Sequence, residues 1–105
     1  AMLLPMITSY SIEAAPERYA DCAKAIGVAN QDDYPDIANQ KLVQALININ
    51  NDLQVPTLAE FGVSKQTFDE LVQTMAEQAL ASGSPNNNPH VPSIAEMVSL
   101  YQQLW

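Results

Sequence analysis

The sequence predicts an all-α fold, a bundle of about five to six helices. Apolar residues recur at three- and four-residue steps along most of the chain, which is the period of a helix with one buried face. Pro, Gly and helix-capping residues separate these segments. No stretch alternates apolar and polar residues as a half-buried strand would. At 105 residues, we expect residues 1–105 to form a single helical domain.

The first two helices are expected at residues 2–10 and from Pro16 to Gly27. Pro5 falls in the first turn of the first helix, where a missing N–H is tolerated. Pro16 suits a first helical position, Glu17 suits the positive end of the helix dipole, and Gly27 suits the residue after a helix end. The expected buried stripe of the second helix is Tyr19, Cys22, Ala23 and Ile26.

The third helix is the longest periodic segment. We expect it to start over Asp33-Tyr34-Pro35 with Asp32 or Asp33 as its cap, and to end near Gln54 because Pro56 cannot continue it. Its predicted apolar face is Ala38, Leu42, Ala45, Leu46, Ile49 and Leu53, widened by Val43 and Ile47.

Residues 55–63 connect the third helix to the next long one. Residues 57–61 should form one short helical turn that ends at Gly62, and Ser64 should cap the following helix. The apolar stripe of that helix is Phe68, Leu71, Val72, Met75, Ala76, Ala79 and Leu80, which we expect in the core.

Residues 82–92 are a loop by composition, and Ser93 and Glu96 form a predicted capping box that opens the last helix. Asn side chains in such a loop usually bond back to the backbone and build turns. A polar, structured loop between two long helices could also line a ligand cleft.

Composition excludes several classes of function. The chain has 12 acidic and 4 basic residues, a net charge of −8, which argues against binding nucleic acid or an anionic membrane. No apolar run is long enough to span a bilayer. Cys22, the single Cys, is expected to be a small buried hydrophobe, consistent with a reducing, cytoplasmic location.

The chain offers no self-contained catalytic, cofactor-binding or metal site. A metal site needs several clustered ligands, and only one His and one Cys are present. His90, the single His, lies in a polar loop with no nucleophile motif beside it. Three Gly in total leave no Gly-rich loop for a dinucleotide phosphate.

Four motifs, in order along the chain, resemble the C-terminal helical domain of the iron-dependent (group III) alcohol dehydrogenases. They are AMLLP at residues 1–5, PERYA with AIGV at 16–28, VPTLAEFGV at 55–63, and Asn88-Pro89 followed by Ile94, Val98, Leu100, Tyr101 and Trp105. The resemblance covers essentially the whole chain.

The resemblance implies an α/β domain that binds NAD(P), a helical domain, and an active-site Fe²⁺ held by one Asp and three His. In the family, those ligands and the nucleotide site lie upstream of the region that this chain matches. We therefore expect a truncated or split alcohol dehydrogenase or aldehyde reductase, with no Fe²⁺ or NAD(P) bound by this chain alone and no activity without an N-terminal nucleotide-binding partner.

The same resemblance places one loop near the substrate cleft. Its candidate residues are Ser84, Asn86, Asn88 and His90. His90 stands where the family usually has Arg, so a role of that Arg does not transfer. The alternative function is a non-enzymatic helical interaction module derived from the family. In either case, an apolar patch left by a missing domain should drive homo-oligomerisation.

Overall fold

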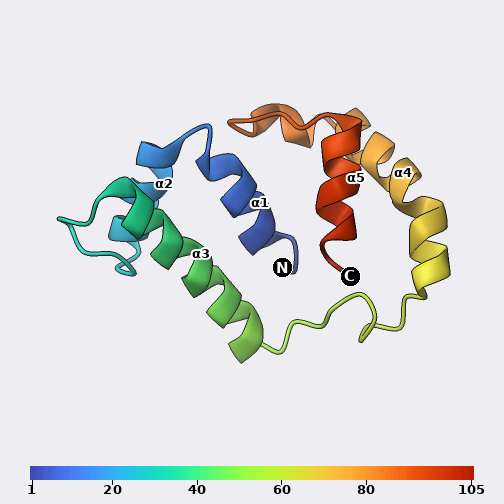
Figure 1. Ribbon diagram of the computed structural model, residues 1–105, viewed down its shortest axis with the longest axis horizontal. Coiled ribbons are helices and arrows are strands. Elements are labelled where there is room, and N and C mark those ends of the chain that lie inside the picture. The colour runs from blue at the N-terminus through green and yellow to red at the C-terminus, as the bar shows by residue number, and fades with distance from the viewer. The chain divides into compact units, whose positions relative to one another are not determined.

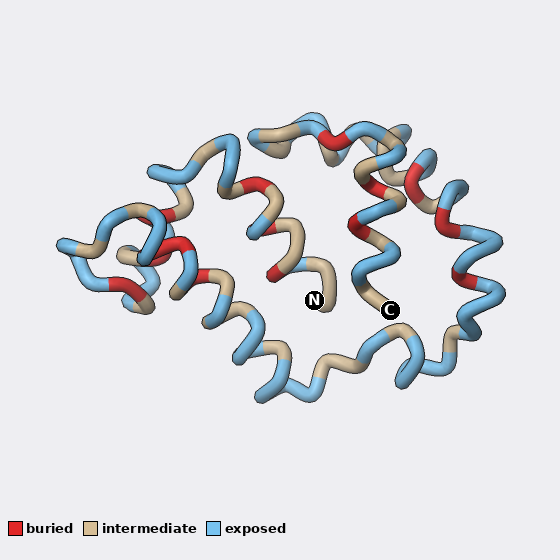
Figure 2. Tube along the Cα trace, viewed as in Figure 1, coloured by how far each residue is buried: buried red, intermediate tan, exposed pale blue.

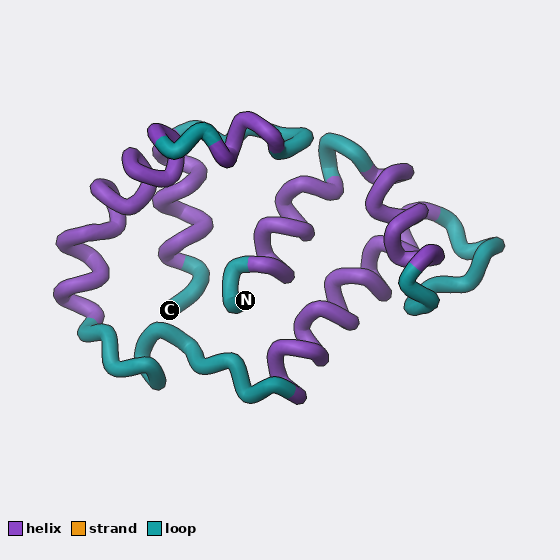
Figure 3. Tube along the Cα trace, turned by 180° about the vertical axis from the view of Figure 1, so that it is seen from behind, coloured by secondary structure: helices purple, strands orange, loops and turns teal.

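A computed structural model describes all residues, 1–105, and confirms the all-α fold (Figure 1). It contains five α-helices, one short 3-10 helix and no strand (Figure 3). The elements are α1 (Leu4–Ile12), α2 (Pro16–Ala25), α3 (Pro35–Asp52), α4 (Lys65–Ala81), the 3-10 helix η1 (Ser84–Asn87) and α5 (Ile94–Gln102).

The helices group into two compact units. The first is Leu3–Val55 with Ala1, and the second is Pro56–Trp105 with Met2. The single domain expected from the chain length stays a prediction.

In the first unit, α3 packs against both α1 and α2. Its core is small: Ala20 and Ala23 of α2 meet Ala38 and Leu42 of α3, with Ala29 from the loop between them. Alanine faces let two helix backbones approach closely, and the partly buried side chains of Tyr19, Val28 and Leu46 close the rim of this core. Helix α1 contributes the buried residue Ser11, whose hydroxyl donates to the Ile7 carbonyl at 2.7 Å.

Two helices of this unit end in the same hydrogen-bonded motif. After α2, the Val28 N–H donates to the Ala23 carbonyl and the Gly27 N–H to the Lys24 carbonyl, with Gly27 at φ +80°. After α3, the Val55 N–H donates to the Asn50 carbonyl, and Gln54 takes the left-handed position at φ +52°. The predicted helix ends at Gly27 and near Gln54 are therefore confirmed.

The second unit begins with the connector of residues 56–63. The Thr57 hydroxyl accepts from the Glu60 N–H, and the Glu60 carboxylate accepts from the Thr57 N–H. One helical bond, from the Phe61 N–H to the Thr57 carbonyl, follows, and Gly62 ends the turn at φ +94°. The expected single turn is present, although it does not extend into a helix.

Helices α4 and α5 form the core of the second unit. Phe68, Val72 and Ala76 recur every four residues along α4 and are buried, and α5 buries Met97 and Leu100. Ser64 caps α4 by accepting from the Thr67 N–H, and Ser93 and Glu96 form the predicted capping box of α5.

The predicted cap of α3 is wrong. Tyr34 occupies the cap position without a side-chain hydrogen bond. The Asp33 carboxylate instead accepts from the ammonium of Lys41, which lies in the second turn of α3. It also accepts from the Asn30 N–H at 2.8 Å. Both bonds hold the pKa of Asp33 below its usual value, and the bond with Lys41 is the larger of the two causes.

Several residues expected in the core are exposed (Figure 2). Cys22 is exposed rather than buried, because α2 turns Ala20 and Ala23 toward α3 and leaves Cys22 on the opposite side. Ile26 is also exposed, as are Ile49 near the end of α3, Leu53 directly after that helix, and Leu71 on α4. None of the helices is both long and apolar enough to cross a membrane.

Candidate functional site

The candidate site is the loop between α4 and α5, which belongs entirely to the second unit. It leaves α4 at Gly83, whose φ of +78° reverses the chain. The Ser82 hydroxyl accepts from the Ser84 N–H at 3.2 Å and donates to the Ala79 carbonyl at 2.6 Å. A single 3-10 turn, η1, then occupies part of the segment expected to be irregular.

The loop then closes on itself at Asn88. Its side-chain amide donates to the His90 carbonyl at 2.7 Å. This bond spans Pro89 and sets the backbone direction from which the His90 side chain projects. The interpretation of the Asn run as a turn builder is therefore correct for Asn88.

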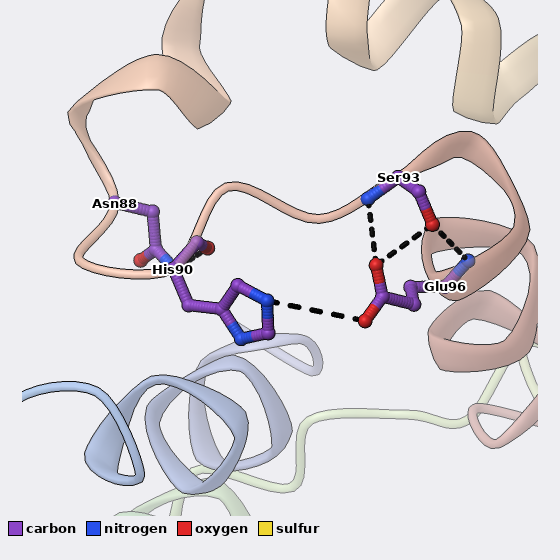
Figure 4. A network of polar contacts seen from close by, with 4 residues as sticks. All are labelled: Asn88, His90, Ser93 and Glu96. Carbon is purple, nitrogen blue, oxygen red and sulfur yellow. Dashed lines mark hydrogen bonds and ion pairs between the residues drawn. The ribbon is translucent and has the colours of Figure 1, made fainter.

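His90 faces the first turn of α5 (Figure 4). Its Nε2 lies 3.9 Å from Oε1 of Glu96, an ion pair when the imidazole is protonated. The other carboxylate oxygen of Glu96, Oε2, accepts from the Ser93 N–H at 2.8 Å and from the Ser93 hydroxyl at 2.7 Å. Glu96 therefore joins the helix cap to the loop that carries the histidine.

This combination of Ser, His and Glu is not a nucleophile triad. The Ser93 hydroxyl donates to Glu96, and it accepts from the Glu96 N–H at 3.3 Å. A nucleophilic serine needs its proton directed to a base such as His. The side chains of His90 and Glu96 are 43% and 45% exposed, so water screens their attraction. The arrangement positions the loop rather than activating a hydroxyl.

The four candidate residues have different surroundings. Ser84 and Asn86 lie in η1 with exposed side chains, Asn88 is half-buried in its own turn, and His90 is half-buried beside Glu96. Their contact with a substrate stays a prediction. The second role of Glu96 has no signature in the sequence, because five residues, Pro92 among them, separate it from His90 and no helical period relates the two.

The residues of this chain do not fit an iron site by themselves. A mononuclear non-haem iron site takes a cluster of His and carboxylate ligands. No group of three or more His, Cys, Asp or Glu side chains that could hold a metal ion is present. The only His, His90, contacts a carboxylate that is already committed to a helix cap.

The glycines do not fit a dinucleotide site either. A phosphate-binding loop places Gly immediately before a helix that follows a strand. Here Gly27 and Gly62 end helical turns, and Gly83 follows the last turn of α4. All three therefore serve to stop or reverse the chain.

Comparison with known proteins decides the family. The sequence profile of the "Fe-containing alcohol dehydrogenase family, C-terminal" matches residues 1–105. The chain belongs to the Fe-containing alcohol dehydrogenase family. The resemblance that the four sequence motifs indicate is thus confirmed over the whole chain.

Family members with assigned activities share about three residues in ten with this chain. The NADPH-dependent butanol dehydrogenase of Clostridium saccharobutylicum is 31% identical over 107 residues, covering 97% of this chain and 26% of that protein. The lactaldehyde reductase of Escherichia coli K12 is 28% identical over 106 residues, covering 100% of this chain and 27% of that protein. The chain therefore spans about a quarter of the length of these relatives.

A solved family structure has the same helical fold. The crystal structure of a 1,3-propanediol oxidoreductase matches 99% of this chain with a TM-score of 0.85 and 28% identity, over 26% of its own length. The family C-terminal region thus accounts for all five helices and the connecting loops.

Proposed function

We propose that this chain works as the C-terminal helical part of an iron- and NAD(P)-dependent alcohol dehydrogenase or aldehyde reductase. The observation that carries the proposal is the family match over residues 1–105 together with the fold match to a 1,3-propanediol oxidoreductase. Relatives named for butanol, lactaldehyde and 1,3-propanediol suggest a small alcohol or aldehyde as the substrate class.

In this proposal the chemistry depends on groups that another part of the enzyme supplies. When bound, Fe²⁺ would polarise the substrate oxygen and the nicotinamide would exchange hydride. The chain brings together no metal-ligand cluster, and its glycines end helical segments. We therefore propose that the isolated chain is catalytically inactive and that its partner is a nucleotide-binding, iron-binding domain of the same family.

The contribution of this chain would be a wall of the substrate cleft. The loop carrying Ser84, Asn86, Asn88 and His90 is a short, internally bonded segment whose shape is set by the Asn88 turn and the Glu96 contact. A pre-formed polar loop costs little ordering entropy when substrate binds, which suits a role in orientation.

A segment exchange tests this function. The matching C-terminal segment of a 1,3-propanediol dehydrogenase is replaced by this chain, and the chimera is loaded with Fe²⁺ and assayed for NAD(P)H-linked aldehyde reduction. We expect turnover by the chimera and none by the same enzyme lacking the segment. A folded, iron-loaded chimera without turnover would contradict the proposed role. Turnover by the isolated chain with Fe²⁺ and NAD(P)H would contradict its dependence on a partner.

The alternative is a non-enzymatic interaction module. The exposed apolar residues Ile49, Leu53 and Phe61 favour contact with some other protein surface. Co-purification with a family nucleotide-binding domain would support the enzymatic role. A stable complex with an unrelated protein, formed in preference to that domain, would support the alternative.

A further inference from the structure

An open groove of about 910 Å³ lies on the first unit, between α1, the start of α2 and the first half of α3. Most of its accessible lining is apolar, with contributions from Ile12, Tyr34 and Val43. The loop described above does not contribute to it, and of the four sequence motifs only PERYA reaches it, through Pro16 and Glu17. Tyr34 is 78% exposed, so its ring is accessible at the edge of the groove.

The charged residues that line this groove are all acidic. Glu13 directly follows α1, Glu17 lies in the first turn of α2, and Asp36 lies in the first turn of α3. No Lys or Arg lines the groove, and none of the three carboxylates takes part in an ion pair. A ligand with an apolar ridge and positively charged edges would complement this surface.

A buried amide supplies an independent indication of a missing partner. Asn39 lines the groove and is 4% exposed. Its Nδ2 donates to the Pro16 carbonyl at 3.0 Å. This bond fixes the orientation of the amide, because a flipped amide would place Oδ1 against the carbonyl oxygen and both atoms are acceptors. Oδ1 is then left without any hydrogen-bond partner. A buried unpaired acceptor costs free energy, which an entering N–H or O–H donor would recover.

We propose that the groove binds an amphipathic helix of another polypeptide, with an apolar ridge and Lys or Arg along its edges. A helix satisfies its own backbone hydrogen bonds, and a Lys or Arg side chain at its edge would supply the donor that Asn39 Oδ1 lacks. A second copy of this chain is a poor occupant. Its 12 acidic residues against 4 basic ones would bring like charge to the acidic edges.

The probe is a synthetic amphipathic helix of about five turns with a Leu ridge and Lys edges. It is titrated into the isotope-labelled full chain and followed by NMR. We expect shifts confined to α1, the start of α2 and the first half of α3, including the Asn39 side-chain carbonyl. The same peptide with Glu in place of Lys should not bind. Absence of binding by the Lys peptide, or shifts confined to α4 and α5, would overturn the proposal.

Matched charge variants separate groove recognition from general attraction to an acidic protein. The E13Q/E17Q variant should bind the Lys peptide about fivefold more weakly. The E70Q/E77Q variant removes the same charge from α4, outside the groove, and should bind as the parent does. Equal weakening in both variants would refute groove recognition. Shifts of the same groove resonances on simple concentration, without peptide, would identify a second copy as the occupant and also refute the proposal.

Discussion

The rings of Phe68 and Trp105 lie with their centroids 5.4 Å apart and their planes tilted by 38°. The ammonium of Lys65 lies over both rings, 5.3 Å from the Phe68 centroid and 5.5 Å from the Trp105 centroid. The last residue of the chain is thereby attached to the first turns of α4. Tilted aromatic pairs and cation–π contacts each add stability beyond the area they bury.

Replacing Trp105 with Ala should lower the free energy of unfolding by about 1–3 kcal/mol, because the ring contact and the cation–π contact are both lost. Trp105→Phe keeps an aromatic ring and should lose less than half as much. Urea unfolding followed by far-UV circular dichroism measures both variants. An alanine variant as stable as the parent would show that the ring pair contributes nothing.

Replacing Gln54 with Gly should raise the free energy of unfolding by about 0.5–1 kcal/mol. Gln54 holds φ +52° at the end of α3, a conformation that costs free energy for any residue with a Cβ. The matched opposite is Gly27→Ala, which should be destabilised by about 1 kcal/mol. A Cβ at Gly27 would meet nothing within 4 Å, so backbone conformation alone causes that loss. Thermal and urea unfolding measure both the expected gain and the expected loss in the free energy of unfolding.

Replacing Ser93 with Ala should cost about 1 kcal/mol, because it removes the acceptor for the Glu96 N–H and one donor to the Glu96 carboxylate. Ser99→Ala, an exposed change inside α5, is the control and should be neutral or slightly stabilising. Similar losses in the two variants, measured by urea unfolding, would contradict the importance of the capping box.

The pairing of Asp33 with Lys41 should make stability depend on acid pH. The pKa of Asp33 is lowered in the folded state, so the folded protein binds this proton more weakly than the unfolded chain does. The contribution is complete above the unfolded pKa of about 3.9 and disappears as pH falls through the lower folded-state pKa. Asp33→Asn should flatten this part of the pH profile in urea unfolding, and a variant profile as steep as that of the parent would contradict the prediction.

We predict that the isolated chain self-associates through the last turn of α3 and the residue that follows it, Leu53. Ile49 and Leu53 are 51% and 71% exposed, and apolar surface of this kind favours association. The I49Q/L53Q variant should reduce the concentration dependence of the mass measured by light scattering. Leu71→Gln, on α4, is the control for loss of an exposed apolar side chain elsewhere. A parent chain that stays monomeric at high concentration contradicts this prediction.

Helix positions could be read from the sequence because local chemistry decides them. Pro16, Gly27, Ser64 and Ser93 act within one turn of their own backbone, and each occupies the predicted position. The predicted cap of α3 is wrong because the interaction that decides it is not local. Asp33 has a longer-range partner in Lys41, and a charged hydrogen bond to that partner replaces the cap.

The candidate loop was only partly predictable. The turn at Asn88 was expected, because Asn side chains tend to form hydrogen bonds with nearby backbone groups. The meeting of His90 with Glu96 depends on how the chain passes Pro92 before α5 begins, which no local pattern specifies. The groove beside Asn39 was not predictable at all, since its lining comes from three separate helices.

The all-α class and most helix ends follow from residue types at short, regular spacings, and the family follows from four motifs in order along the chain. Which side of each apolar stripe is buried depends on the packing of the helices in space. Cys22 lies on the predicted stripe of α2 yet is exposed, while Ala20 is buried against α3. The physical reason is that periodicity marks an apolar face, whereas burial requires a neighbour in space, and a single α-helix does not specify where its neighbours lie.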